Sequence, residues 1–202
     1  MGIKLGLTYS PYTFAKLSAT ADFPLGITIN EHGTTRTESL FVEGSAYHED
    51  SGVVEEYSLS YPFTFGFGAN LNFMFLNVAG DVVYTDWRQL EYKKPNWMLA
   101  ENKYITDSYR STWTYKIGVE GIVPIIGVSL RAGYAKSPIP YIDDQITDDR
   151  EYVTFGGGVL LAKLMSLDFA AVFSGWEKEN STRNLTEKYK LTKFVAGLSY
   201  RF

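Results

Sequence analysis

Ionisable residues stand at alternate positions of segments whose other positions are apolar, and this spacing limits the chemistry that they can do. They occupy the polar positions of these segments: Lys4, Lys16, Glu56, Asp81, Lys116, Glu120, Arg131, Asp168, Lys193 and Arg201. Both signs are present, so internal salt bridges can form, and these matter because an unpaired buried charge is costly. Two interpretations stay open. The charges either fill and polarise a narrow interior, or line a path for an ion or solute.

Catalytic and metal sites have little support in the sequence. The chain has two histidines, His32 and His48, in one polar segment, and no cysteine, and no serine has a nucleophile's context. We therefore predict no catalytic residue, no metal site, no cofactor and no enzyme activity. The acidic pairs Asp143–Asp144 and Asp148–Asp149 could attract a divalent cation. A solvated loop is the favoured explanation of such an acidic run.

The segments that position these charges alternate with a period of two. In the last ten residues, Phe194, Ala196, Leu198, Tyr200 and Phe202 fall on one side and small or charged residues on the other. A β-strand places successive side chains on opposite faces. An apolar, aromatic face opposite a polar face is typical of outer-membrane barrels, which are apolar toward lipid and polar toward the lumen. A soluble β-sandwich is the alternative, but recurrent large aromatics opposite ionisable groups favour the barrel.

The alternation predicts an all-β, antiparallel, up-and-down barrel of eight strands in a single domain over residues 1–202. We expect strands near residues 2–22, 53–68, 72–88, 113–120, 128–134, 151–161, 166–177 and 187–202. Short turns at 68–71 and 122–125 alternate with long polar loops at 92–108 and 137–149, as periplasmic turns alternate with extracellular loops. An even strand count places both termini on the periplasmic side.

Composition agrees with a membrane barrel. Aromatic residues make up 16% of the 202 residues, which suits interfacial girdles, and no apolar run is long enough for a transmembrane helix. The net charge of −4 argues against a nucleic-acid partner. No signal peptide precedes Gly2, and because the strand pattern starts at once, we expect that a leader has been removed.

Several phrases, in this order, resemble one family. They are Gly6–Ser10, Tyr61–Phe63, Val83–Trp87, Trp113–Gly118, Leu130–Tyr134 with Ser137–Pro140, the Asp149–Arg150 pair and Tyr200–Phe202. The chain resembles the carboxy-terminal part of the FadL-type channels, which take up long-chain fatty acids and aromatic hydrocarbons across the bacterial outer membrane. That family has a fourteen-stranded barrel with an amino-terminal hatch. The hatch and the early strands have no counterpart here, so we transfer no ligand-binding residue.

The resemblance implies a passive channel for long-chain fatty acids or other hydrophobic solutes, located in the bacterial outer membrane and performing no chemistry. It also implies contact with membrane lipid or detergent, and with the barrel-assembly machinery through the terminal Phe202. The alternative is a small closed barrel, truncated or engineered, that has lost transport. Because side chains just fill an eight-stranded barrel, we expect the isolated chain to conduct ions poorly or not at all.

Overall fold

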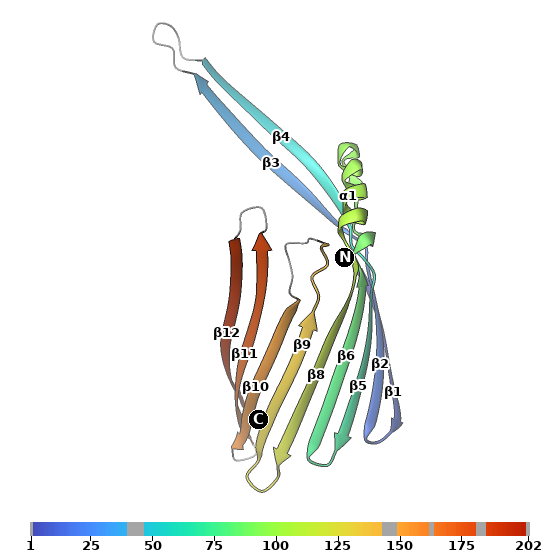
Figure 1. Ribbon diagram of the computed structural model, residues 1–202, viewed down its shortest axis with the longest axis vertical. Helices are drawn as coiled ribbons and strands as arrows, with labels where there is room; N and C mark the ends of the chain where they lie inside the picture. Colours follow the sequence, from blue (N-terminus) through green and yellow to red (C-terminus); the bar gives the residue numbers. More distant parts are fainter. Residues whose placement is uncertain (1, 40–46, 143–148, 162–163, 181–184, 201–202) are drawn as a thin grey trace.

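The computed structural model describes residues 2–39, 47–142, 149–161, 164–180 and 185–200, and most of them lie in antiparallel β-strands. The principal sheet has nine strands in the order β1-β2-β5-β6-β8-β9-β10-β11-β12 (Figure 1). Their bounds are β1 Gly2–Tyr12, β2 Ala15–Pro24, β5 Thr64–Phe73, β6 Leu76–Asp86, β8 Ser111–Val123, β9 Val128–Ser137, β10 Arg150–Leu161, β11 Met165–Asn180 and β12 Leu185–Tyr200. The predicted all-β, antiparallel class is confirmed.

The strand register keeps apolar residues beside apolar residues. Ile3 pairs with Phe23, Leu5 with Ala21 and Leu7 with Ala19 across β1 and β2, while the intervening Lys4, Gly6 and Thr8 pair with Asp22, Thr20 and Ser18. The same phase continues through the other strands of the principal sheet. We call the face of Leu130, Phe155 and Phe194 the outer face, and the face of Asp81, Glu120 and Arg131 the inner face.

The predicted count of eight strands is not confirmed, because the structure has nine strands in this sheet. The segment predicted as one strand over 2–22 is a hairpin, β1 and β2, joined by a tight turn at Thr13–Phe14. This turn carries none of the glycine or asparagine residues that usually mark one. Tyr12 pairs with Ala15 across this turn, and a register shift between Tyr9 and Tyr12 then brings odd-numbered residues of β1 opposite odd-numbered residues of β2, as Tyr9 is opposite Leu17. The odd-numbered residues from Ile3 to Tyr9 and from Leu17 to Phe23 therefore share one face, as the alternation predicts, although the strand count differs.

Among the described residues the sheet is open rather than closed into a barrel, since its order ends at β1 on one side and at β12 on the other. Because the sheet has an odd number of strands, its first and last residues lie at opposite strand ends. Gly2 lies at the end of the sheet where the long connections are, and Tyr200 lies at the end where the short turns are (Figure 1). The expectation that both termini share one side is therefore wrong for the described strands.

A second, three-stranded sheet accounts for most of the remaining differences. Strands β3 Ile27–Ser39, β4 Tyr47–Ser60 and β7 Glu91–Lys94 form it, and the β3–β4 hairpin projects beyond the principal sheet (Figure 1). Gly26 turns the chain out of β2 with a φ of +87°, and a Cβ there would lie 2.5 Å from the Leu59 carbonyl oxygen. Only glycine fits this position without strain.

The chain returns to the principal sheet at Tyr61–Phe63, where the Phe63 amide donates to the Gln89 side-chain oxygen at 3.1 Å. This break divides the segment predicted as one strand over 53–68 between β4 and β5. The turn predicted at 68–71 lies inside β5, and the observed turn is at Met74–Phe75.

The segment predicted as a polar loop over 92–108 is ordered. It contains part of β7, the 3-10 helix η2 Asn96–Ala100 and the helix α1 Glu101–Ser108, and follows the short η1 Trp87–Gln89. The Asn102 side chain accepts from the Tyr92 amide at 2.7 Å and donates to the Tyr92 carbonyl at 2.9 Å, which fixes α1 against β7. In the part of the chain that the structure describes, no helix is long and apolar enough to span a membrane.

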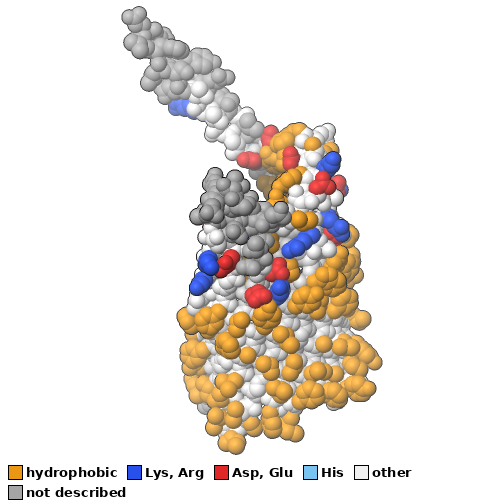
Figure 2. All heavy atoms as spheres, in the orientation of Figure 1, with side chains coloured by type: hydrophobic (Ala, Val, Ile, Leu, Met, Phe, Trp, Pro, Cys, Tyr) orange, Lys and Arg blue, Asp and Glu red, His pale blue; other side chains and the backbone are white. Residues whose placement is uncertain are grey.

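The predicted asymmetry between turns and loops is present. Tight connections join β1 to β2, β5 to β6 and β8 to β9 at one edge, whereas the second sheet and α1 lie at the opposite edge (Figure 1). Figure 2 shows apolar side chains over the lower part of the principal sheet, with charged side chains gathered between them and the hairpin. The outer face is therefore apolar over the sheet and becomes polar toward the long connections.

Candidate functional site

The inner face of the principal sheet carries small and polar side chains in cross-strand rows. One row, read from the strand pairing, is Thr8, Ser18, Gly68, Asp81, Lys116 and Ala135. Another row is Asn72, Asn77, Glu120, Arg131, Gly156, Ala170 and Val195. Because most members are short, the face leaves open volume above the backbone.

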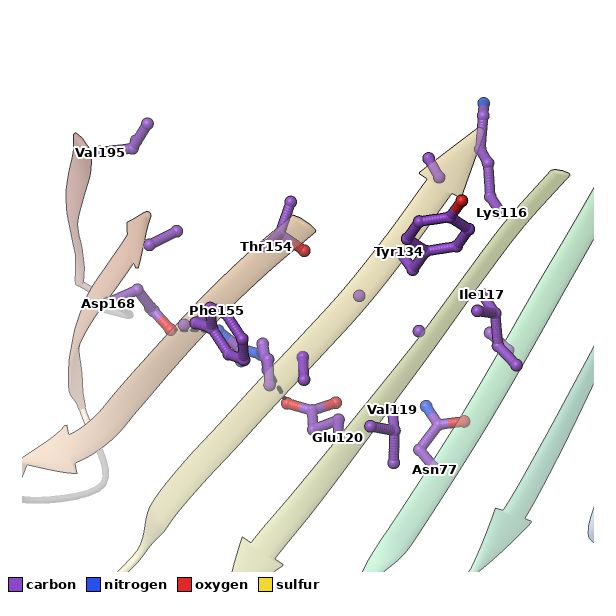
Figure 3. A pocket seen from close by; sticks show the side chains of 18 of the residues that line it. Asn77, Lys116, Ile117, Val119, Glu120, Tyr134, Thr154, Phe155, Asp168 and Val195 are labelled. Atoms are coloured by element: carbon purple, nitrogen blue, oxygen red, sulfur yellow. Dashed lines mark hydrogen bonds and ion pairs between the residues drawn. The ribbon is translucent and has the colours of Figure 1, made fainter. Parts of the chain in front are cut away.

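A cavity of about 650 Å³ lies over the middle of this face (Figure 3). Five of the predicted ionisable residues border it: Asp81, Lys116, Glu120, Arg131 and Asp168. Between them lie glycines and alanines, among them Ala79, Gly118 and Ala135, and residues of the outer phase such as Ile117 and Phe155 border it too. The cavity thus combines a charged stripe with small apolar patches.

The charged stripe centres on Arg131. Its Nε donates to Glu120 Oε1 at 2.8 Å, and one terminal nitrogen donates to Asp168 Oδ1 at 2.7 Å. Glu120 lies on β8, Arg131 on β9 and Asp168 on β11, so the guanidinium reaches across β10. Arg is suited to this bridge, because its planar fork can donate to two carboxylates at once. The pairs hold the wall together and leave no charge of the three without a partner.

Glycines in β10 make room for that bridge. Gly156 is the register neighbour of Arg131, and Gly158 is the register neighbour of Asp168. A Cβ on Gly158 would lie 2.3 Å from the Asp168 carboxylate and 3.1 Å from the Ser129 hydroxyl. Glycine at positions 156 and 158 therefore allows the neighbouring strands and the Asp168 side chain to approach β10 closely.

The same arrangement recurs four strands away. Asp81 on β6 lies over Gly68 on β5 toward Ser18 on β2, and a Cβ on Gly68 would lie 2.6 Å from both side-chain oxygens. In both places an aspartate, a glycine and a serine occupy matching positions on three adjacent strands. Because these carboxylates lie flat over glycines, they leave the space above the inner face open.

The remaining predicted residues lie elsewhere. Lys4 pairs with Asp22 at 3.0 Å on β1 and β2, and Lys16 is the register neighbour of Asn70. Lys193 is in the inner phase of β12, opposite Val172. Glu56 is not on the inner face, because it belongs to β4 of the second sheet and pairs with Lys94 at 3.2 Å. Arg201 lies outside the described residues.

Sequence reasoning missed two inner-face partners. Asp22 continues the phase of Lys16, Ser18 and Thr20, so the alternation could have identified it. Asn70 donates to Asn77 through their side-chain amides at 2.7 Å. Asn70 was missed because a turn was predicted at 68–71, where the structure has a strand.

Asp149, the one described member of the acidic pairs, does not resemble a cation ligand. Asp149 lies 3.2 Å from Lys136 and 3.7 Å from Arg110, so its carboxylate is already neutralised, while Asp143, Asp144 and Asp148 lie outside the described residues. Among the described residues no three metal-ligating side chains cluster. His32 is an exposed residue of β3.

Comparisons with known proteins agree with this architecture. No family model and no curated protein matches the chain. Two crystal structures of the Pseudomonas putida toluene transporter TodX match all of it, with TM-scores of 0.58 and 0.59 and identities of 18% and 20%. A Pseudomonas aeruginosa FadL homologue matches all of it with a TM-score of 0.60 and 16% identity. The chain spans 49%, 49% and 52% of these proteins.

These matches extend over every described strand, and they agree with the resemblance carried by the sequence phrases. At such identities they establish the fold and nothing finer. The chain has the fold of the FadL-type transporters, of whose length it spans about half.

Proposed function

We propose that this chain forms part of the wall of a bacterial outer-membrane barrel that passively admits long-chain fatty acids or other hydrophobic solutes. The observation that carries the proposal is the opposition of the two faces. The outer face is aromatic and aliphatic, with Leu130 62% and Phe194 76% exposed. The inner face carries the cavity, with the ion pairs of Arg131 to Glu120 and Asp168 at its border.

The outer face suits lipid because its strands expose large apolar side chains that water would disfavour. A soluble protein rarely exposes an apolar patch of this extent, whereas an outer-membrane barrel carries such a band by design. The charges toward the long connections mark the level at which this band would meet water.

The inner face suits an apolar solute because the charges of Glu120, Arg131 and Asp168 are already paired. Arg131 is occupied by two carboxylates, so it offers little to an anion, and the surfaces left between the charges are Ala79, Gly118, Gly133 and Ala135. An apolar solute loses nothing by lying on such surfaces. The alternative of a small closed barrel that has lost transport has no specific support, because the described sheet is open. Poor ion conductance stays a prediction.

Photoaffinity labelling tests the proposal. The chain is refolded in phosphatidylcholine vesicles, irradiated with a fatty acid that carries a diazirine near its methyl end, and digested for mass spectrometry. We expect labels on inner-face residues around Gly118 and Ala170, reduced by excess oleate. Labels confined to outer-face residues such as Leu130 and Phe155, and insensitive to oleate, would contradict the proposal.

A matched pair of glycine variants sharpens this test. Gly118 lies on the inner face of β8, where a Cβ would make only an ordinary contact of 3.8 Å with the Ala132 carbonyl, and Gly121 lies on the outer face with nothing within 4 Å. We expect Gly118→Phe to fill the cavity and lower oleate-sensitive labelling by about tenfold, which corresponds to about 1.4 kcal/mol of binding free energy. Gly121→Phe should leave it unchanged.

A further inference from the structure

The outer face of β11 and β12 changes from apolar to charged between Phe194 and Lys190. Toward the short turns, the outer-phase residues of β12 are Tyr200, Leu198, Ala196 and Phe194. Toward the long connections, the next outer-face register pairs are Phe173–Thr192, Gly175–Lys190 and Glu177–Lys188. Two lysines therefore follow the apolar residues on the same face of the same strand.

These lysines lie where the apolar band ends. Figure 2 shows the charged side chains of this face gathered between the apolar band and the β3–β4 hairpin. If the band lies in lipid, the charged level lies among the lipid headgroups, and this step rests on the proposed function. Anionic headgroups attract lysines at that level. The residues of the charged level are therefore candidates for contact with lipid phosphate.

The cations at this level differ in how far they are neutralised. Lys188 lies 2.7 Å from Glu177, and Lys136 of β9 lies 3.2 Å from Asp149. Lys190 is exposed, and no carboxylate of the described residues lies within ion-pair distance of it. The charge of Lys190 is thus left unbalanced in the described part of the chain, and an anion is its complement.

Gly175 leaves an opening beside Lys190. It stands between Glu151 and Lys190 in one cross-strand row, so two strand spacings, about 10 Å, separate these charged residues. The backbone does not require glycine here, because φ is not positive and a Cβ would lie 3.4 Å from its nearest neighbour, the Tyr189 carbonyl oxygen. This glycine therefore opens the outer surface instead of relieving a clash. Lys190 and Thr192 border the opening on β12.

We propose that this opening binds the phosphate of an anionic phospholipid, one whose only charge is on the phosphate. The free phosphate oxygens accept hydrogen bonds from the Lys190 ammonium and the Thr192 hydroxyl, and Lys188 adds attraction from the next outer position. The acyl chains lie along Phe173 and Phe194 on the same face. A single negative charge suits the site, because Lys190 is a cation that no described carboxylate balances. A zwitterionic lipid carries its own ammonium, and a free phosphate ion lacks the chains, so neither matches both parts of the site.

Native mass spectrometry of lipid adducts tests this proposal. The chain in non-ionic detergent is titrated with phosphatidylglycerol or phosphatidylcholine, and inorganic phosphate is added as a competitor. We expect phosphatidylglycerol to bind about fivefold more tightly than phosphatidylcholine and to stay bound when inorganic phosphate equals it in concentration. Equal binding of the two lipids, or displacement by inorganic phosphate at that concentration, would overturn the proposal.

A matched pair of lysine variants locates the phosphate. Lys190 and Lys193 both belong to β12, but Lys193 is in the inner phase. We expect Lys190→Gln to weaken phosphatidylglycerol binding by about fivefold, Lys190→Arg to retain it, and Lys193→Gln to leave it unchanged. Equal weakening by the two glutamine variants would mean attraction to net charge alone and would contradict a site at Lys190.

A pair of glycine variants tests the opening without changing any charge. Gly175→Val fills the outer surface beside Lys190, whereas Gly197→Val adds a side chain to the inner phase of β12, where nothing lies within 4 Å of a Cβ. We expect Gly175→Val to weaken phosphatidylglycerol binding by about tenfold and Gly197→Val to leave it unchanged. Circular dichroism checks that both variants keep the sheet. Full binding by a folded Gly175→Val variant would show that the opening is not the site.

A further measurement separates this proposal from the proposed function. A single-tryptophan variant retains Trp113, on the outer face of β8, and brominated lipid serves as the quencher in vesicles. Absence of quenching at Trp113 would remove the membrane location and with it both proposals. Quenching at Trp113 together with unchanged phosphatidylglycerol binding by Lys190→Gln would leave the membrane location intact and overturn only the phosphate site.

Discussion

The nine-stranded sheet and the β3–β4 hairpin of the second sheet have strands of similar length but different surfaces. The sheet has one apolar face, whereas the described side chains in the middle of β3 are polar on both faces. In the nine-stranded sheet, one phase of each strand is aromatic or aliphatic and the other is small or polar. In β3, the residues from Asn30 to Thr37 are exposed and polar on both phases. Ladder hydrogen bonds form in both regions, so strand formation does not require an apolar face. If the chain has the proposed function, the alternation reflects the surroundings of each sheet, which are lipid on one side of the principal sheet and water around the hairpin.

A charge placed on the apolar face should give the largest difference between the nine-stranded sheet and the hairpin. We expect Leu130→Arg on β9 to lower the free energy of unfolding in vesicles by about 2–4 kcal/mol at mid-bilayer depth, and by less toward the interface. The measurement is a urea titration followed by tryptophan fluorescence. Thr34→Arg in the hairpin should change stability by less than about 0.5 kcal/mol.

Replacing the adjacent Ser129 by alanine should matter far less than Leu130→Arg. Equal effects at 129 and 130 would show that the inner and outer faces are reversed.

Glycine substitutions should separate the regions next. A Cβ on Gly156 of β10 would lie 2.9 Å from the Phe169 carbonyl oxygen, so the backbone must move. We expect Gly156→Val to cost about 1–3 kcal/mol by overpacking. Gly33 of β3 has nothing within 4 Å of the same position, and Gly33→Val should be neutral or slightly stabilising, since valine favours strands. Paired urea titrations measure both, and a costly Gly33→Val would refute the idea of an open, solvated hairpin.

The ion pairs of the two sheets give a smaller contrast. Arg131→Met leaves two neighbouring carboxylates without their cation, and we expect a loss of about 1–2 kcal/mol, since the side chains are partly exposed. Lys94→Met removes the exposed Lys94–Glu56 pair, where a loss of about 0–0.5 kcal/mol is expected.

A double-mutant cycle isolates each coupling, using Glu120→Gln with Arg131→Met and Glu56→Gln with Lys94→Met. If the coupling energy of the Arg131–Glu120 pair is no larger than that of the Lys94–Glu56 pair, the inner face is as accessible to water as the hairpin.

The smallest effect is a titration at the base of the hairpin. Tyr57 of β4 donates to the Glu55 carboxylate, and this hydrogen bond raises the pKa of Tyr57 from 10.0 to about 12. A raised folded-state pKa stabilises the fold below pH 10, and the contribution is lost as the pH rises from about 10 to about 12. Ultraviolet difference spectra should show a late-titrating tyrosine component, and Glu55→Gln should reduce it by returning the pKa of Tyr57 toward 10. An unchanged late component would assign it to another tyrosine.

Much of the inner face was predictable from the sequence. The alternation of side chains assigns residues to one face even where the number of strands is predicted wrongly. Glu120, Arg131 and Asp168 were placed on one face by alternation alone, and the structure joins them in one ion-pair cluster. Their pairing was not predictable, since it depends on strand register and on Gly156 and Gly158 leaving β10 low. Glu56 was misplaced because the break in the strand at Tyr61–Phe63 transfers the chain from one sheet to another, and the alternation of residue types continues across that break.

The sequence by itself determined the strand character, the opposition of an apolar and a polar face, and the alternation of tight turns with long connections. Each of these depends on residues near one another in the chain, through the two-residue period of a strand. Only the tertiary structure decided that nine strands form the principal sheet, that β3 and β4 leave it, and that its ends stay open. Those features depend on which strands pair and in which direction, and pairing joins residues that lie far apart in the sequence.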